Sequence, residues 1–343
     1  MNYPHFPSDC TSLLRQYLTP EVFEQLKDKK TPNGFTLAQA IHSGVVNVDS
    51  SIGVYAGDKE SYTVFAPLFD PIIEAYHGFR KDDMHKSNLD PDDLRAPNPD
   101  PEGKYIISTR IRVGRNLEHM PLGPGISKEQ RNSVESNVVE ALHSLEGELA
   151  GVYYPLLGMS KEVQSKLIKE HFLFKEGDRF LDAAGLNRDW PEGRGIYHNN
   201  DKTFLVWVNE EDQLRIISMQ QGGDIKEVFE RLSHAVQSIE SKVKFAYSDH
   251  LGYITSCPTN LGTAMRASVH IALPNLSKDM EQFKDITQRY HLQIRGIHGE
   301  HSESEGGVYD ISNRRRLGIT EIEAVQDMYD GVVALILAEK ALS

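Results

Sequence analysis

Cysteine and long apolar runs are both scarce in this sequence of 343 residues. Only Cys10 and Cys257 are present, which is too few for a disulfide framework and too widely spaced for a zinc cluster. No run of about 18 apolar residues occurs, and the opening MNYPHFPSDC lacks the basic and apolar segments of a signal peptide. We therefore expect a soluble, cytoplasmic protein with no membrane partner.

Positive charge is in deficit, because 50 acidic residues face 37 basic ones and the formal net charge is −13. The average field repels nucleic acids and anionic membranes, so neither is expected as a partner. The GxxxxGK[ST] phosphate loop and the HRD and DFG motifs are also absent. A nucleotide, if one binds, must therefore be held by a local cluster of cationic side chains.

The order of the segments predicts an α+β fold in two domains. Residues 1–85 contain short helical stretches, one of which starts at Thr19-Pro20-Glu21, and predict a small all-helical N-terminal domain. Residues 86–103 are rich in Pro, Asp and Asn, which is typical of a solvated interdomain linker. Residues 104–343 mix strand-like and amphipathic helical stretches, and the turn NEEDQ indicates a hairpin. We predict there a larger C-terminal domain with an antiparallel β-sheet flanked by helices.

Arginine recurs at alternate positions of several predicted strands. In ISTRIRV a period of two places Arg110 and Arg112 on one face, and in RASVHIAL it aligns Arg266 with His270. Arg215 follows the acidic turn of the hairpin. A solvated outer face explains most single arginines, but repetition on separate strands favours an anion clamp, since guanidinium groups bind oxyanions in a bidentate manner. The opposite face of the first strand is predicted to be core and comprises Ile107, Thr109, Ile111 and Val113.

The segment CPTNLGTAMRASVHIALP, residues 257–274, closely resembles the signature of the phosphagen (guanidino) kinases. The resemblance continues through ISTRIRVGR, HFLFKEGDRFL, TFLVWVNEEDQLRIISMQQGGD and RGIHGEHSESEGGVYDISNRRRLG, and so covers nearly the whole chain. It implies reversible transfer of the γ-phosphoryl group of Mg-ATP to a guanidinium. Two features resemble a particular group within the family, the members that convert L-arginine and ATP to phosphoarginine and ADP. These features are the segment DSSIGVYAGDKESYTVF and the residue Glu300.

The resemblance also implies the site residues. Histidines beside the adenine and ribose would be His171 and His270, and Glu210 would reach Mg²⁺ through water. Glu211 and Glu300 would grip the guanidinium, by positioning more than by base catalysis. The phosphate-binding arginines would be Arg110, Arg112, Arg215, Arg266 and Arg295. The residues assigned to catalysis would be Arg215, Arg266, Arg295, Glu211, Glu300 and Cys257. The amino-acid end of the substrate would lie against Ser50, Ser51, Ile52, Gly53 and Tyr55.

Cys257 would lie near the non-reacting guanidinium nitrogen, where Thr259 and a cationic substrate would favour a thiolate. Three alternatives stay open. The substrate could be taurocyamine, lombricine or creatine. Cys257 could instead be the nucleophile of a guanidino hydrolase or amidinotransferase. A silent binding protein is disfavoured, because the matched arginines and carboxylates are present.

Some positions depart from the family pattern. Ile297 and His298 stand where Thr and Arg are usual, and Ala272 replaces a usual Lys. Asp49 and Arg179 match an interdomain ion pair, and the two domains are expected to close on the substrates. The sequence leaves the oligomeric state open between monomer and homodimer.

Overall fold

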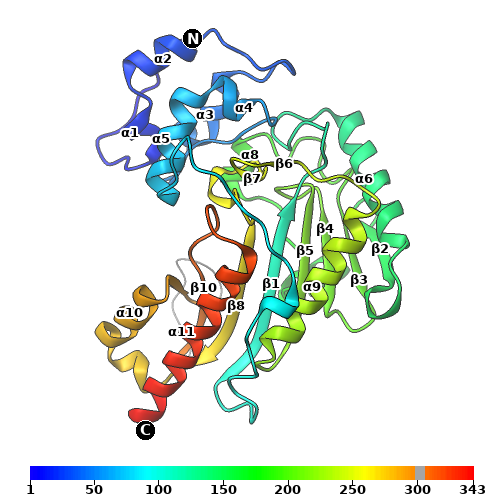
Figure 1. The fold of residues 1–343 in the computed structure, drawn as a ribbon. Helices are drawn as coiled ribbons and strands as arrows, with labels where there is room; N and C mark the ends of the chain where they lie inside the picture. Colours follow the sequence, from blue (N-terminus) through cyan, green and yellow to red (C-terminus); the bar gives the residue numbers. More distant parts are fainter. Residues whose placement is uncertain (298–305) are drawn as a thin grey trace.

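A small helical part and a larger part built on an eight-stranded sheet make up the molecule (Figure 1). The structure is a computed structural model that describes residues 1–297 and 306–343. The predicted α+β class is confirmed, and every pairing in the large sheet is antiparallel. No helix among the described residues is long and apolar enough to cross a membrane.

Polar side chains cap the first three helices of the N-terminal part. The Thr19 side chain accepts from the backbone N–H of Val22, and Pro20 occupies the first helical position, as the sequence predicts. Thr36 and Gln39 form a reciprocal capping box. The helices are α1 (Leu13–Tyr17), α2 (Pro20–Leu26), α3 (Leu37–Val46), α4 (Ser61–Val64) and α5 (Ala66–His77).

The large sheet has the strand order β2-β3-β4-β5-β1-β8-β10-β9. A separate two-stranded ribbon, β6 (Tyr247–Ser248) and β7 (Gly252–Tyr253), lies near the N-terminal part. The strands of the sheet are β1 (Ile106–Arg115), β2 (Gly151–Pro155), β3 (Gly195–Asn199), β4 (Phe204–Val208), β5 (Leu214–Gln221), β8 (Met265–Ala272), β9 (Leu292–Arg295) and β10 (Val308–Asn313).

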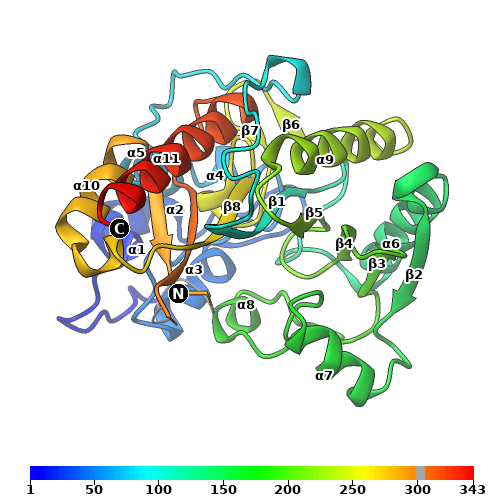
Figure 2. The same ribbon diagram turned by 90° about the horizontal axis from the view of Figure 1, so that it is seen from below.

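Helices lie on both faces of this sheet, and the face opposite the main core also carries the arginines of β1. Figure 2 shows α9 and α11 on one side of the strands, with α7 and α8 on the other. Apolar residues of α6, α9 and α11 pack with those of the strands into the main core. The helices of this part are α6 (Lys128–His143), α7 (Lys161–Lys169), α8 (Arg179–Ala183), α9 (Ile225–Glu240), α10 (Met280–Arg289) and α11 (Glu321–Ala341), with short 3-10 turns at Pro91–Asp93, Gly147–Leu149, Pro258–Asn260 and Leu276–Lys278.

The alternation predicted for β1 holds except at its start. Thr109, Ile111 and Val113 are fully buried in the core, whereas Arg110 and Arg112 lie on the opposite face. Ile107 is 46% exposed and does not belong to the core. The register against β8 shifts between residues 106 and 108, and such an irregularity turns the intervening side chain outward.

The N-terminal part shares an apolar core with residues of the C-terminal part. Phe65 and Phe69 are fully buried in one cluster with Ile254 and Leu261, which flank the signature cysteine. Backbone contacts reinforce this packing, because the N–H of Ala56 donates to the carbonyl of Ser256 at 2.8 Å. The Tyr62 hydroxyl donates to the carbonyl of Thr255 at 2.6 Å. The segment 254–261 is therefore held by the small helical part.

The segment 86–103 is less solvated than its composition indicates. Leu94 and Ala96 are 1% and 2% exposed and belong to the main core. Glu321, fully buried at the start of α11, accepts from the Ser87 hydroxyl at 2.7 Å and from the Asn88 N–H at 3.2 Å. Contacts with distant residues anchor Leu94 and Ala96, although most other residues of the segment are exposed, and local composition cannot reveal such anchors.

Asp100 fixes the entry into β1, and its removal is expected to destabilise the fold. Its carboxylate accepts from the backbone N–H groups of Lys104, Tyr105 and Ile106 at 2.8–3.0 Å and is 5% exposed. Asp100→Ala leaves these donors unsatisfied, so the free energy of unfolding should fall by about 2 kcal/mol or more. Urea denaturation measures the change. Asp82→Ala, at an exposed position, is the matched control and should stay within about 0.5 kcal/mol of the parent; equal effects of both changes would contradict the assignment.

Candidate functional site

A cavity of about 1080 Å³ lies between the N-terminal part and the open face of the sheet. The loop 49–53 and the start of α8 line one side of the cavity. The later part of α10 and the strand β9 line another side. The β4–β5 hairpin and the signature segment meet in its wall. Residues of the cavity that carry charge or a thiol include Arg112, Glu210, Glu211, Arg215, Cys257, Arg295 and Arg316.

Strand pairing brings the predicted clamp arginines together. Arg112 pairs in register with Arg266, and Gly114 on the same strand pairs with Arg215. The guanidinium carbons of Arg110 and Arg215 lie 5.5 Å and 4.9 Å from the ring centroid of Trp207. The indole face therefore separates and supports two like charges.

The cluster carries more positive charge than its protein partners neutralise. Burial, with Arg215 and Arg266 nearby, lowers the pKa of Arg110 to about 10. Burial and the neighbouring arginines also hold the pKa of Arg112 well below its ordinary value. Buried Nε atoms of Arg110 and Arg266 have no hydrogen-bond partner among the described residues. Such donors and such charge fit a polyanion, because phosphate oxygens would satisfy both.

Two carboxylates face the arginines from the β4–β5 hairpin. Carboxylate oxygens of Glu210 and Glu211 each lie 3.8 Å from Nη2 of Arg215, and both side chains are about one-sixth exposed or less. Burial, together with the negative charges of Asp212 and Glu210, raises the pKa of Glu211 to about 8, against the opposing effect of Arg215. Glu211 is thus largely protonated near neutral pH until a cation approaches it.

The signature cysteine is a neutral thiol in this structure. Cys257 is 6% exposed, and its Sγ lies 3.1 Å from the Thr259 hydroxyl. Burial and the nearby Glu211 raise the pKa of Cys257 to about 12, although Thr259 acts in the opposite direction. The thiolate that the sequence predicts beside a cationic substrate stays a prediction, because the cation on which it depends would belong to the ligand.

Asp310 is a site residue that the sequence reasoning missed. Its carboxylate forms a short ion pair with Nη2 of Arg266, and its other oxygen lies 3.2 Å from Nε2 of His270. The register of β10 against β8 places Asp310 directly opposite His270. An acidic residue in the strand-like stretch VYDISN, after the second arginine-bearing strand, was the available signal.

Arg316 is a second cavity residue that the sequence did not assign. It is 9% exposed and lines the cavity. Its Nη1 donates to the carbonyl of Thr259 at 3.2 Å and to the side-chain oxygen of Asn260. Arg316 therefore fixes the backbone just after Cys257. The run RRR in the sequence does not reveal which of the three arginines turns inward.

Some of the remaining predicted site residues line the cavity, and others do not. All five loop residues Ser50, Ser51, Ile52, Gly53 and Tyr55 line the cavity, as does Arg295. In the described part of the chain, its walls do not include Arg110, Arg266, His171 or His270. His171 is exposed. Glu300 and His298 lie outside the described residues.

Asp49 and Arg179 form the ion pair that the sequence predicts. Nη1 of Arg179 donates to a carboxylate oxygen of Asp49 at 2.8 Å and to the side-chain oxygen of Asn47 at 3.0 Å. Both charged side chains are more than half exposed, so the pair contributes little to stability. The pair does join the loop 49–53 to the start of α8. The Ser43 hydroxyl makes a further contact with this helix, because it donates to the carbonyl of Phe180 at 2.7 Å.

Comparison with known proteins decides the family. Residues 8–74 match the N-terminal domain of ATP:guanido phosphotransferases, and residues 133–342 match the C-terminal catalytic domain. This chain belongs to the ATP:guanido phosphotransferase family. The predicted enzyme class, phosphoryl transfer between ATP and a guanidino compound, is thereby confirmed.

Similar family members include several curated arginine kinases. One from Penaeus vannamei is 59% identical over 337 residues, which is 98% of this chain and 94% of that protein. One from Anthopleura japonica is 59% identical over 96% of this chain and 46% of that protein. Among solved structures, a lombricine kinase has a TM-score of 0.93 at 41% identity, covering 99% of this chain and 95% of that one. The substrate-free duplicated taurocyamine kinase from Schistosoma mansoni has a TM-score of 0.91 at 44% identity, covering 97% and 48%.

Glu211 is expected to make guanidino binding to this phosphotransferase dependent on pH. The ionised carboxylate is the form that attracts a guanidinium, which itself stays charged at all relevant pH values. Because the pKa of free Glu211 is raised to about 8, affinity should rise with pH, by roughly tenfold between about pH 6.5 and about pH 8.5. Calorimetry in buffers of different ionisation enthalpy should also show proton release on binding near neutral pH.

Two variants control this pH prediction. Glu211→Gln should bind the guanidine weakly and without the pH dependence, whereas Glu146→Gln, at an exposed position, should behave as the parent. A parent affinity that is flat across this pH range would show that Glu211 is already ionised in the free protein.

Proposed function

We propose that this protein is an arginine kinase, which transfers the γ-phosphoryl group of Mg-ATP reversibly to the guanidinium of L-arginine and gives phosphoarginine and ADP. The observation that carries the proposal is the division of one cavity between a buried arginine cluster and the pair Glu211 and Cys257. The arginine cluster suits a triphosphate, and the pair Glu211 and Cys257 suits a guanidinium. Arginine kinases at 58–59% identity over 98% of the chain support the choice of arginine.

The arginines would act by binding and electrostatic stabilisation. Phosphoryl transfer needs the two reactants in line, water excluded, and charge stabilised on the equatorial oxygens of the transferred group. Arg112, Arg215 and Arg295 line the cavity, and Arg266 lies beside Arg112 in the sheet. Rigid strands hold at least three of these side chains, which limits the reorganisation required at the transition state.

At the other end, Glu211 and Cys257 would hold the guanidinium. Each guanidinium N–H is a donor, and an ionised carboxylate accepts two of them in a fixed geometry. The charge of the guanidinium would lower the pKa values of both Glu211 and Cys257 from their raised values. We therefore assign positioning to Glu211 in preference to base catalysis, with the thiol as a second, weaker partner.

The loop 50–55 would bind the α-amino acid end of arginine. It is firmly held, because its carbonyls at Ser51 and Ile52 accept from the backbone N–H groups at the start of α1 at 2.9 Å and 3.0 Å. Gly53 has a positive φ of 85°, and a side chain on the adjacent Gly44 of α3 would collide with its backbone. This short, fixed loop sets the length of the guanidine that fits.

Magnesium fits the site as part of the nucleotide substrate. The described residues contain no cluster of three or more His, Cys, Asp or Glu side chains that could hold a metal by themselves. Mg²⁺ commonly binds through one or two carboxylates plus substrate phosphates, and Glu210 offers one carboxylate in the cavity. Bound with ATP, the ion neutralises charge on the phosphate oxygens. Glu210 would orient it through a water molecule.

A cytoplasmic location is part of the proposal. Cys10 and Cys257 are both free thiols, which persist in a reducing compartment, and the proposed co-substrate ATP is abundant there.

Substrate choice is tested with a panel of guanidines. Purified protein with Mg-ATP should phosphorylate L-arginine with a kcat/KM at least about a hundredfold above those for taurocyamine, lombricine and creatine, because none of the others presents an α-amino acid group at the same distance from its guanidinium. Coupled ADP detection and phosphorus NMR of the product measure this. Preference for taurocyamine or lombricine, which the solved structural relatives are named for, would reject arginine and keep the family activity.

The thiol is tested by Cys257→Ser. If Cys257 only contacts the guanidinium, the variant should lose about tenfold to a thousandfold in kcat and still make phosphoarginine, because the arginine cluster remains. If the thiol attacks the guanidinium carbon, all activity should disappear. Mass spectrometry of the parent during turnover distinguishes these cases, since an amidino adduct on Cys257 without an ATP requirement would overturn the kinase proposal.

A further inference from the structure

The two cavity carboxylates have few side-chain contacts of their own. Glu210 accepts from the N–H of Glu211 at 3.0 Å, and both carboxylates lie 3.8 Å from Nη2 of Arg215. Each therefore depends on the backbone of the five-residue β4–β5 turn, which the N–H of Asn209 closes by donating to the carbonyl of Gln213 at 2.9 Å. The anchors of this turn decide where Glu210 and Glu211 point.

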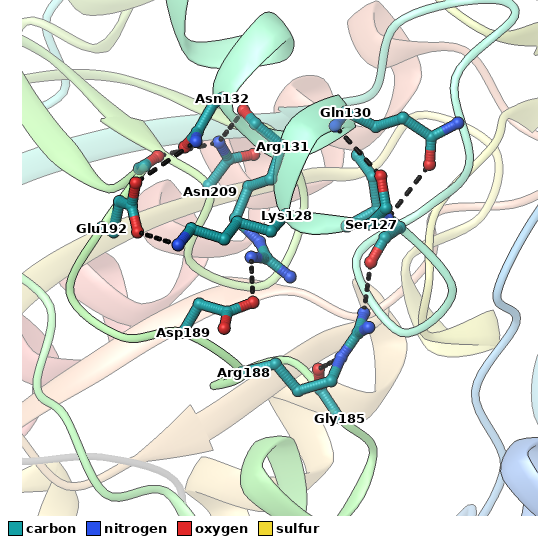
Figure 3. Close-up of polar contacts among 12 residues, drawn as sticks. Ser127, Lys128, Gln130, Arg131, Asn132, Gly185, Arg188, Asp189, Glu192 and Asn209 are labelled. Carbon is teal, nitrogen blue, oxygen red and sulfur yellow. Dashed lines mark hydrogen bonds and ion pairs between the residues drawn. The ribbon is translucent and has the colours of Figure 1, made fainter.

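Asn209 is the first of these anchors. Its φ of 60° is left-handed, a conformation that asparagine adopts more readily than most residues. Its side-chain amide donates to the carbonyls of Gly193 at 2.9 Å and Arg131 at 3.3 Å, and the residue is 8% exposed. Figure 3 shows Asn209 beside Arg131 in the first turn of α6. The turn is thus tied to two segments that are distant in sequence.

Arg194 is the second anchor. It is 1% exposed, and its Nε donates to the carbonyl of Asn209 at 3.3 Å. Its other nitrogens donate at 2.7–2.9 Å to the carbonyls of Leu186, Arg188 and Glu192. All these acceptors are backbone carbonyls. A buried charge is costly unless it is fully hydrogen-bonded, so this guanidinium fixes the shape of the loop 186–193 against the turn.

The far end of the turn is held independently. The Asp212 carboxylate accepts from the Asn116 amide and the Ser256 N–H, both at 2.9 Å. Gln213 accepts from the N–H of Leu117 at 2.8 Å through its side-chain oxygen. With both ends fixed, only Glu210 and Glu211 project into the cavity between them.

We propose that Asn209 and Arg194 are positioning residues, which set the direction of Glu210 and Glu211 and thereby the placement of Mg²⁺ and the guanidinium. This inference rests on the proposed function for the identity of the two ligands. Neither residue lines the cavity in the described part of the chain, so neither touches substrate. A displacement of the carboxylates by about 1 Å is enough to cost on the order of a hundredfold in rate.

Asn209→Gly is the decisive variant, because glycine accepts the left-handed φ and removes only the two side-chain hydrogen bonds. It should lower kcat by about thirtyfold, raise KM for the guanidine, and shift the Mg²⁺ dependence to higher concentration. Binding of ADP without guanidine should change less than about twofold, since the arginines lie on other strands. The pH at which guanidine affinity is half-maximal should also move, because Glu211 changes its surroundings.

Asn132→Ala and Asp189→Asn are the matched controls. Asn132→Ala removes the side-chain contact between Asn132 of α6 and Glu192 of the loop 186–193. Asp189→Asn weakens the ion pair between Asp189 of this loop and Arg131 of α6 (Figure 3). Both changes leave the two backbone carbonyls that accept from the Asn209 amide in place. Both should keep kcat within about twofold of the parent. If a control loses as much activity as Asn209→Gly, general loosening of the loop is the cause and the proposal fails.

Arg194→Lys is the second test. Lysine keeps the charge but cannot reach four carbonyls in one plane, so kcat should fall while the circular dichroism spectrum is retained. If this variant does not fold, Asn209→Gly alone decides.

Unchanged kcat and pH profile in folded Asn209→Gly would overturn the proposal. If the parent fails to use arginine, the function proposal fails, and the same ratios are measured with whichever guanidine it phosphorylates.

Discussion

The attachment of the small helical part to the signature segment is the constraint on which the cleft depends. Residues 254–261 share an apolar cluster with Phe65 and Phe69, and their backbone accepts from Ala56 and Tyr62. Cys257 belongs to the same apolar cluster as Ile52 and Tyr55 of the loop 50–55, so this core fixes their separation. The domain closure predicted from the sequence would have to keep these contacts. It would then move the sheet side and its loops relative to this unit.

In the cleft, arginines of the sheet meet the carboxylates of the β4–β5 hairpin, where Glu210 and Glu211 each lie 3.8 Å from Nη2 of Arg215. Arginines project from β1, β5 and β8, and their mutual repulsion is relieved by the Trp207 ring and by Asp310. Glu211 faces them, and burial together with its acidic neighbours raises its pKa to about 8 against the opposing effect of Arg215. The arginines thus suit an anionic ligand, and Glu211 suits a cationic one. A triphosphate completes one end and a guanidinium the other, so each ligand improves the field for its partner.

Local pattern was enough to predict much of this architecture. The period of two in ISTRIRV identified the cationic face carrying Arg110 and Arg112, and α2 starts after Thr19, as the sequence indicated. The misses arose from distant contacts. Leu94 and Ala96 are buried by the main core, and the bulge near Ile107 depends on the neighbouring strand. Burial raises the pKa of the Cys257 thiol, and Glu211, 46 positions earlier in the chain, adds to this shift. No local window contains those partners.

Asp310 would act as an internal competitor at the proposed nucleotide site. Its carboxylate pairs with Arg266 and lies 3.2 Å from Nε2 of His270, so an incoming anion would gain from these side chains only what exceeds the internal pairing. A single weak oxyanion, such as free phosphate or a carboxylic metabolite, would make one such exchange at little net gain. A nucleotide bound by several arginines at once would absorb the same loss. The proposed site would then select long polyphosphates over small anions through this internal pairing, without a surface that excludes them by shape.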